Sequence, residues 1–122
     1  MKIIVVGDGK VGFAIAKQLN QEGHDITVVE NKANVLSSTM NQLDIVGVQG
    51  NGASLDTLLE ARVPSSDLLI AATSTDEVNI ICCLLAKKYM IRGLRLIKNI
   101  LFQSKEEHSS FSCAIGIIAK RK

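Results

Sequence analysis

The strongest constraint on the fold is a glycine pattern near the N-terminus. Residues 7–12 read Gly-Asp-Gly-Lys-Val-Gly, directly after the apolar run at 3–6 and directly before a segment with apolar residues at helical spacing. A run of four apolar residues is typical of a strand that is buried on both faces. A GxGxxG pattern between such a strand and a helix predicts the opening unit of a doubly wound α/β sheet, with a phosphate site at the turn.

The same alternation of strand and helix patterns continues along the chain. Short β-branched runs are separated by segments with apolar residues at helical spacing, and this order predicts parallel βαβ units with right-handed connections. We therefore expect an α/β fold, a Rossmann-like doubly wound and mainly parallel sheet, in a single domain over residues 1–122. Strands are predicted at 3–6, 25–30, 44–49 and 67–72, with weaker patterns at 94–98 and 113–118, and helices at 10–21, 31–42, 54–60 and 76–89.

Length and composition exclude several classes of protein. A chain of 122 residues makes one ordinary domain and is too short for a nucleotide-binding domain plus a separate substrate domain. Its 47% hydrophobic and 21% charged residues are typical of a folded protein. No apolar run approaches the ~20 residues of a membrane-spanning helix, and the N-terminus lacks the apolar stretch of a secretory signal. We expect a cytoplasmic protein with no direct membrane insertion.

The glycine pattern predicts a phosphate site that is built from main-chain atoms. Gly7 permits the tight turn, Gly9 lacks the Cβ that would keep a pyrophosphate away from the backbone, and Gly12 lets the helix pack closely on the sheet. The free N–H groups of the first helical turn then point at the anion, with the helix dipole behind them. The candidate phosphate-binding residues are Gly7, Asp8, Gly9, Lys10, Val11 and Gly12.

An acidic residue follows at the place where such folds bind a ribose. Glu30 ends the second predicted strand, eighteen residues after Gly12. A carboxylate there accepts hydrogen bonds from both hydroxyls of an adenosine ribose and repels a 2′-phosphate. The pattern therefore favours NAD(H) or an adenine nucleotide over NADP(H), and Lys32 nearby softens this preference. The alternative is that the glycines shape a structural turn and that Glu30 caps a strand.

Two further loops follow predicted strands at the same edge of the sheet. Residues 49–54, Gln-Gly-Asn-Gly-Ala-Ser, are expected beside the adenine, although an ordinary Asn-Gly turn explains them equally well. Residues 73–75, Thr-Ser-Thr, offer hydroxyl groups to the crevice where the strand order reverses, and an N-cap of the following helix is the alternative. The candidate residues from the loops after the second, third and fourth strands are Asn31, Asn51, Gly52, Thr73 and Ser74.

Residues for catalysis are missing from the predicted site. Hydride transfer needs a second substrate and usually a general acid or base, and no His, Tyr-Lys pair or reactive cysteine is positioned for this role. The three cysteines form no CxxC pattern, so buried thiols are expected rather than a metal site. Binding without turnover, hence no enzyme, is the favoured interpretation. A small NAD-dependent oxidoreductase, or a fragment of one, is the alternative.

The charge of the chain is divided unevenly. Residues 1–86 carry five basic and ten acidic side chains, whereas residues 87–122 carry nine basic and two acidic ones. A basic end such as Lys-Arg-Lys at 120–122 can attract nucleic acid or anionic lipid. No aromatic residues alternate with these charges as stacking platforms, so we expect a solvated tail and no nucleic-acid partner. A nucleic-acid or membrane-surface binder is the alternative.

Three segments together resemble one known family. Residues 2–12, 48–52 and 71–79 are similar to the Trk-type potassium uptake NAD-binding domain, which is also called KTN or the N-terminal lobe of RCK domains. The similarity covers approximately residues 1–90. The segment Thr-x-x-Asp-Glu-x-Asn at 73–79 is much more specific than the glycine pattern.

The resemblance implies a cytoplasmic subunit, peripheral to the inner face of the membrane, that binds NAD(H), and often ADP or ATP, as a gating ligand for a membrane potassium transporter or channel subunit. It also implies a homo-oligomer, either a dimer or a ring of dimers. When the family's site is carried over by position, residues 7–11 are expected to bind the phosphates and Glu30 to bind the ribose. Thr73 and Ser74 are expected to contact the ligand on the other side of the point where the strand order reverses. A basic residue in the family's fifth strand also reaches the ligand, and Lys98 is the nearest counterpart.

The resemblance ends near Met90. Where the family continues through a basic strand into a Pro-Glu-Tyr-like turn, this chain has Asn-Ile-Leu-Phe-Gln at 99–103. Together with the change in net charge, this indicates that residues 90–122 are divergent, truncated or altered in reading frame. The expectations for Lys98, the sixth predicted strand and the nicotinamide half of the site concern the part of the chain that differs from the family. The expectation for the adenosine half does not depend on that part.

Overall fold

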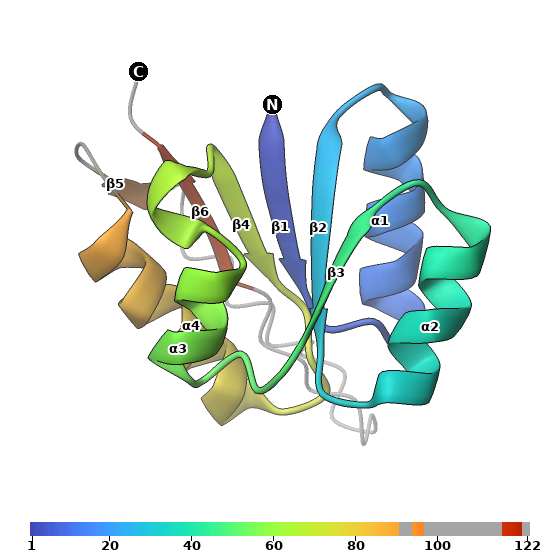
Figure 1. Ribbon diagram of the computed structural model, residues 1–122. Coiled ribbons are helices and arrows are strands. Elements are labelled where there is room, and N and C mark those ends of the chain that lie inside the picture. Colours follow the sequence, from blue (N-terminus) through green and yellow to red (C-terminus); the bar gives the residue numbers. More distant parts are fainter. Residues whose placement is uncertain (91–93, 97–115, 121–122) are drawn as a thin grey trace, which may run out of the picture.

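Within the described part of the chain, six strands form one sheet with helices on both faces (Figure 1). The computed structural model describes residues 1–90, 94–96 and 116–120. The sheet has the strand order β3-β2-β1-β4-β6-β5, and its first four strands are arranged as in a doubly wound α/β fold. The strands are β1 (Lys2–Val6), β2 (Asp25–Glu30), β3 (Val46–Gln49), β4 (Leu68–Ala71), β5 (Leu94–Leu96) and β6 (Gly116–Lys120).

The first four strands are parallel, which confirms the prediction from the alternating patterns. β1 pairs with β2 on one side and with β4 on the other, and β2 pairs with β3. The connections between them contain helices, since parallel strands need a crossover. The helices are α1 (Lys10–Gln21), α2 (Ala33–Gln42), α3 (Leu55–Glu60) and α4 (Asp76–Tyr89), with a 3-10 helix, η1, at Val63–Ser65.

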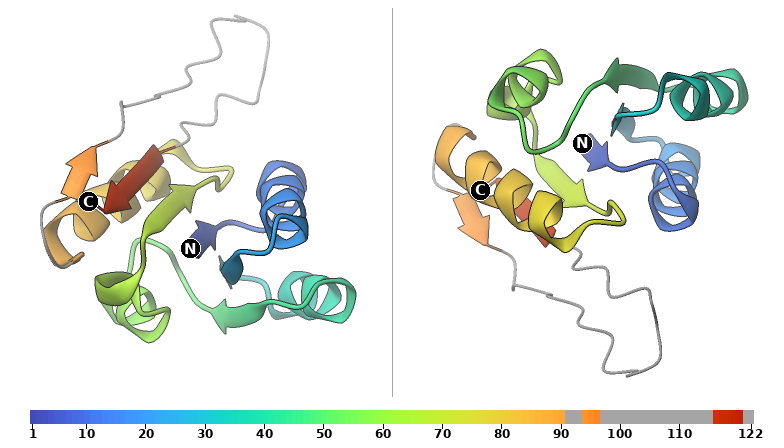
Figure 2. Two further views of the ribbon diagram at one scale, coloured as in Figure 1. Left: turned by 90° about the horizontal axis from the view of Figure 1, so that it is seen from above. Right: turned by 90° about the horizontal axis from the view of Figure 1, so that it is seen from below.

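The sheet separates two hydrophobic cores, one on each face. In β1, Ile3 and Val5 belong to the core that includes residues of α1 and α2, whereas Ile4 and Val6 belong to the core that includes residues of α3 and α4. These four side chains are at most 2% exposed, as expected for a strand that is buried on both faces. The end-on views show the two pairs of helices on opposite faces of the sheet (Figure 2).

The helices α1 and α4 begin and end where the sequence predicted. The N-cap of α1 is Gly9, and Gly23 follows its end with a φ of +89°, a left-handed conformation that glycine adopts without strain. α4 has acidic residues in its first turn and basic residues in its last turn, which complements the helix macrodipole. None of the helices in the described part of the chain is long and apolar enough to cross a membrane.

The segments α2 and β3 start two residues later than predicted. The Glu30 carboxylate accepts the N–H of Lys32, whose backbone is extended, so α2 begins only at Ala33. After α2, Leu43 is also extended, and its carbonyl accepts the N–H of Ile45 in a tight turn before β3. Boundaries of this kind depend on local hydrogen bonds that the spacing of apolar residues does not report.

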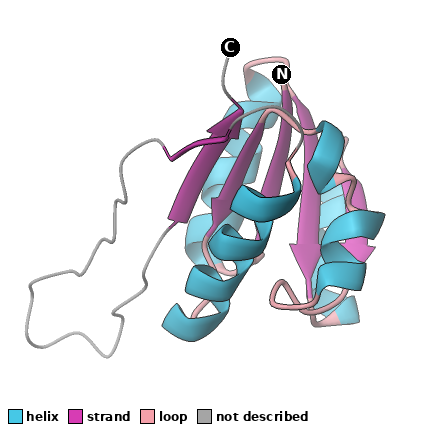
Figure 3. Ribbon diagram, turned by 90° about the vertical axis from the view of Figure 1, so that its left-hand side faces the viewer, coloured by secondary structure: helices cyan, strands magenta, loops and turns pink. Residues whose placement is uncertain are grey.

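The last two strands differ from a parallel arrangement. β6 lies between β4 and β5 and pairs antiparallel with both. A near-continuous apolar run is typical of a parallel strand, but an antiparallel strand that is covered on both faces can have the same run, so the run does not determine strand direction. β5 and β6 form the edge of the sheet that is farthest from β3 (Figures 1 and 3). Residues 97–98, which include Lys98, and residues 113–115 were predicted to belong to these strands and lie outside the described residues.

Candidate nucleotide-binding site

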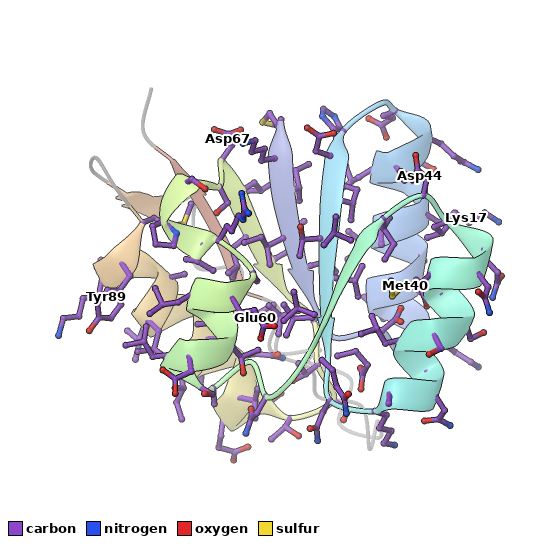
Figure 4. The ribbon with its side chains drawn as sticks, in the orientation of Figure 1. Lys17, Met40, Asp44, Glu60, Asp67 and Tyr89 are labelled. Atoms are coloured by element: carbon purple, nitrogen blue, oxygen red, sulfur yellow. The ribbon has the colours of Figure 1, made fainter. Side chains whose placement is uncertain are left out.

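A cleft of about 340 Å³ lies at the edge of the sheet where β1, β2, β3 and β4 end. Because these four strands are parallel, the loops that follow them converge there. Asp44 and Asp67, which precede β3 and β4, lie at the opposite end of the molecule (Figure 4). The strand order reverses between β1 and β4, and open α/β sheets bind their ligands at such a position.

The glycine turn forms one wall of this cleft. Gly7 has a φ of +103°, and a Cβ there would lie 2.6 Å from the carbonyl oxygen of Ala72, so both conformation and space require glycine. A Cβ at Gly12 would lie 1.9 Å from the Gly7 carbonyl oxygen. A Cβ at Gly9, in contrast, would meet no atom of the described residues within 4 Å. The backbone at Gly9 is therefore open to the cleft, whereas the two other glycines are needed by the fold.

The N-terminus of α1 presents N–H groups next to this open backbone. The N–H of Phe13 donates to the Gly9 carbonyl oxygen at 2.8 Å and closes the first helical turn. The N–H groups of Lys10, Val11 and Gly12 donate to no other described residue, and no side chain caps the helix. Such N–H groups attract an anion, because the helix macrodipole places partial positive charge there. The open backbone and these donors fit a phosphate group.

Glu30, at the end of β2, is held against the glycine turn by two main-chain hydrogen bonds. Its Oε1 accepts the N–H of Asp8 at 3.0 Å, and its Oε2 accepts the N–H of Lys32 at 2.8 Å. Each carboxylate oxygen offers two acceptor positions, so one on each oxygen remains for the hydroxyls of a ribose. The half-buried side chain lines the cleft. Its carboxylate is therefore fixed in place without a ligand.

The loop after β4 is organised by Asn79, a residue of α4 that is only 1% exposed. The Asn79 Oδ1 accepts the N–H of Thr73 at 2.9 Å, and the Asn79 Nδ2 donates to the Thr73 carbonyl oxygen at 3.1 Å. The N–H of Thr75 donates to the Thr73 hydroxyl oxygen at 3.2 Å. Thr75 is the N-cap of α4, but its side chain makes no capping hydrogen bond. Asn79, rather than a capping hydroxyl, fixes the path of this loop.

The loop after β3 closes as a turn and also lines the cleft. The Asn51 Oδ1 accepts the N–H of Ala53 at 2.9 Å, as in an ordinary Asx turn. A Cβ at Gly52 would lie 2.4 Å from Val6, so glycine lets this loop approach the end of β1. The side chain of Asn51 therefore has a structural role in the turn, in addition to its position at the cleft.

Most of the predicted site residues are brought together in this cleft. Lys10 and Val11 lie beside it as exposed residues of the first turn of α1, and Gly12 is buried beneath the turn. Lys98 is outside the described residues. The predicted residues that line the cleft are Gly7, Asp8, Gly9, Glu30, Asn31, Asn51, Gly52, Thr73 and Ser74.

Apolar residues that were not predicted also line the cleft. Val35 and Val78 are half-buried and occupy the first turns of α2 and α4. Each is the third residue of a helix that follows a parallel strand. This position in the sequence could have indicated that both side chains lie at the cleft. The role of Asn79 was also missed, although the residue belongs to the specific segment at 73–79.

The glycine turn, the helix N-terminus and the acidic residue at the end of β2 together form the arrangement of Rossmann-type nucleotide-binding domains. The family model described as the TrkA-N domain matches residues 3–117. The chain therefore belongs to the TrkA-N domain family, which confirms the resemblance to the Trk-type NAD-binding domain.

Curated relatives of this chain carry Trk names. The Trk system potassium uptake protein TrkA homolog of Methanothermobacter thermautotrophicus is 36% identical over 91 residues, which are 75% of this chain and 42% of that protein. The TrkA homolog 2 of Methanosarcina mazei is 45% identical over 87 residues, which are 71% of this chain and 19% of that protein. The chain thus spans less than half the length of these relatives.

Solved structures share the fold at low sequence identity. The Kef CTD of Shewanella denitrificans in its AMP-bound form has a TM-score of 0.64 and 19% identity, covering 73% of this chain and 53% of that chain. L-Sorbose reductase from Gluconobacter frateurii, complexed with NADPH and L-sorbose, has a TM-score of 0.58 and 17% identity, covering 74% of this chain and 46% of that chain. These likenesses support the Rossmann-like fold alone.

Proposed function

We propose that this chain is a regulatory nucleotide-binding domain whose ligand is NAD(H) or an adenine nucleotide such as ATP or ADP. The observation that carries the proposal is the presence, in one cleft, of an open backbone at Gly9 and a fixed carboxylate at Glu30. The N–H groups of α1 suit a phosphate, and the carboxylate suits the two hydroxyls of a ribose. These groups follow adjacent strands, β1 and β2, as the phosphate and ribose of one nucleotide require.

The same geometry favours a ribose without a 2′-phosphate. A phosphate at that position would face the Glu30 carboxylate, and like charges repel. Lys32, which is exposed at the rim of the cleft, softens this repulsion through water. We therefore propose a preference for NAD(H) over NADP(H).

The relatives support a place for the domain in potassium uptake. Two proteins that are 36% and 45% identical to this chain are named as Trk system potassium uptake proteins. We propose a cytoplasmic domain, peripheral to the inner face of the membrane, that works as a homo-oligomer with a membrane potassium transporter or channel subunit as its partner. The nucleotide then acts as a gating ligand rather than as a redox substrate. Regulation of this kind requires that two conformations of the protein differ in nucleotide affinity.

Calorimetric titration with NAD⁺, NADH, ATP and ADP tests the nucleotide site. We expect binding of at least one of them, and we expect Glu30→Ala to weaken it by at least about 1 kcal/mol, because charge-assisted hydrogen bonds to the ribose are lost. Asp44→Ala is the matched control, since it removes an exposed carboxylate at the opposite end of the sheet. Equal affinities of wild type and Glu30→Ala would contradict the assignment of Glu30.

The same samples distinguish regulation from the two alternative functions. Loss of NADH absorbance in the presence of small carbonyl compounds would support a small oxidoreductase instead. Binding to DNA or anionic vesicles that weakens steeply with salt would support a basic-tail binder. We expect neither result.

A further inference from the structure

Asp8 carries a buried carboxyl group inside the turn that is proposed to bind phosphate. The residue lies between Gly7 and Gly9 and is only 4% exposed, although Gly9 is exposed. Its own N–H donates to Glu30, so the backbone of Asp8 is part of the proposed binding surface. An ionised carboxylate on this turn disfavours an anionic ligand, because like charges repel more strongly where water is excluded.

Among the described residues, few groups offset a negative charge on Asp8. Its Oδ2 accepts a hydrogen bond from the hydroxyl of Thr39, a buried residue of α2. Its Oδ1 is buried and has no hydrogen-bond partner among the described residues. The charged group that acts on it from β2 is Glu30, another acid. The basic residues of the adjoining segments, Lys10 at the start of α1 and Lys32 before α2, are both exposed to water.

These surroundings favour the neutral form of the carboxyl. Burial is the largest cause and raises the pKa of Asp8, the hydrogen bond from Thr39 opposes this shift, and the charge of Glu30 adds to it. The loop after β4 contributes Thr73, Ser74 and Thr75 to the cleft, and none of these is an acid or a base. A bound phosphate brings more negative charge to the same turn and therefore raises the pKa of Asp8 further.

We propose, on the basis of the proposed nucleotide function, that Asp8 selects ligands by charge: the cleft binds a nucleotide phosphate together with one proton, which the Asp8 carboxylate takes up. Affinity for a phosphate-bearing ligand then falls as the pH rises, since binding consumes a proton. Adenosine, which has no phosphate, binds without this proton. Asp8 thus determines how strongly phosphates are accepted at a given pH, while the main chain and Glu30 supply the contacts.

Calorimetry of the whole chain with NAD⁺ and adenosine tests this proposal. Titrations between about pH 5.5 and 8.5, in pairs of buffers that differ in ionisation enthalpy, measure proton uptake directly. For the wild type we expect uptake of up to about one proton with NAD⁺ and a fall in affinity of up to about tenfold per pH unit, with neither effect for adenosine. Because the phosphates of NAD⁺ do not titrate in this range, the proton is assigned to the protein.

Asp8→Asn is the decisive variant, because it keeps the size of the side chain and an acceptor for Thr39 but cannot ionise. We expect it to bind NAD⁺ without proton uptake and, at about pH 8, at least about threefold more tightly than the wild type. Thr39→Val removes the hydrogen bond that favours the ionised form of Asp8, so we expect proton uptake on NAD⁺ binding to occur at higher pH. If Asp8 and Thr39 only stabilised the fold, Thr39→Val would not change the pH range of proton uptake. Asp25→Asn, at the exposed start of β2, is the matched control and leaves both quantities unchanged.

Two results would overturn the proposal: binding of NAD⁺ by the wild type without proton uptake, or the same pH dependence in the wild type and in Asp8→Asn. The uptake measured for the wild type decides the question even where Asp8→Asn does not fold. A different result is that neither the wild type nor Asp8→Asn binds NAD⁺ or adenosine at any pH. It would overturn the proposed function and this inference together.

Discussion

The carbonyl oxygen of Gly7 lies so close to the backbone of Gly12 that a Cβ at residue 12 would come within 1.9 Å of it. Gly9 stands between them in the sequence, yet a Cβ there would meet nothing within 4 Å in the part of the chain that the structure describes. The glycines of one motif therefore serve two purposes. Gly7 and Gly12 are required by the packing of α1 on the turn, whereas Gly9 leaves space for a ligand.

Gly9→Ala is expected to separate folding from binding. The free energy of unfolding changes by less than about 1 kcal/mol, because alanine accepts the backbone angles of this N-cap at little cost. Nucleotide affinity falls at least about tenfold, since the new methyl group occupies the place of a phosphate. Gly12→Ala, in contrast, lowers the free energy of unfolding by more than about 2 kcal/mol. Urea denaturation and calorimetry measure the two quantities, and normal binding by Gly9→Ala would argue against the phosphate site.

Asn79→Ala is expected to destabilise the loop after β4. The variant removes the side-chain partners of the Thr73 N–H and carbonyl groups, which costs about 2 to 3 kcal/mol in the free energy of unfolding. Asn34→Ala, an exposed change on α2, is the matched control and alters stability by less than about 0.7 kcal/mol. Urea denaturation gives both values. Equal effects of the two variants would show that the loop does not depend on Asn79.

The thiols of α4 are expected to be nearly inert at neutral pH. Burial raises the pKa of the Cys83 thiol to about 11, and burial raises the pKa of Cys82 as well, with the neighbouring Cys83 adding to that shift. Alkylation of Cys83 in the folded protein should therefore increase about tenfold per pH unit between about pH 8 and 10 without levelling. Peptide mass mapping follows each cysteine separately. A plateau near pH 9 would contradict this prediction.

The same shift links stability to alkaline pH. The folded-state pKa of Cys83 lies above the unfolded value of about 8.5. The contribution of the buried, neutral Cys83 thiol to the free energy of unfolding is therefore fully present below about pH 8.5. It is lost as the pH rises toward about 11, because the unfolded chain releases this proton more readily than the folded protein. Urea denaturation across this range detects the decrease, and Cys83→Ala should reduce it.

Arg62→Gly is expected to stabilise the protein. Arg62 has a φ of +64° and a ψ of +40°, the left-handed conformation that costs a residue with a Cβ about 1 kcal/mol. Part of that gain is offset because glycine adds freedom to the unfolded chain, which leaves a net increase of about 0.5 kcal/mol. Arg62→Ala is the matched control, since alanine also carries a Cβ and brings no such gain. Thermal unfolding of the two variants gives the comparison, and equal melting temperatures would refute the explanation.

The parallel half of the fold was predictable because each of its elements has a local pattern. The run Ile3 to Val6 and the glycines that follow it define β1, the turn and the start of α1 without help from distant residues. Strand direction at β6 was not predictable, since an apolar segment that pairs with a strand on each side can have the same composition in either direction. The start of α2 depends on a hydrogen bond from Lys32 to a side chain of the preceding strand, which spacing does not encode.

The candidate site was predictable where the main chain supplies the chemistry. Glycine spacing indicates an open backbone, and the position of Glu30 at the end of a strand places its carboxylate next to the turn. The contact of Asp8 with Thr39 joins residues 31 positions apart and arises only after α2 packs on the sheet. The contact of Asn79 with Thr73 is local and lies in the specific segment at 73–79, but that segment does not show which of its groups form hydrogen bonds. The pairing of Asp8 with Thr39 depends on tertiary structure, and no spacing in a single sequence predicts it.

The pairing of β1 with β4, in which Ile3 lies opposite Leu68, has a consequence for synthesis of the protein. Because β1 precedes β4 in the chain, β1 cannot complete its hydrogen bonding during synthesis until the region up to Ala71 has left the ribosome. An apolar strand with an uncovered edge readily associates with other chains. β1 therefore stays open to association with other chains until β4 has been made. Pairing of strands this far apart in the sequence is also slower than the local contacts of a helical bundle.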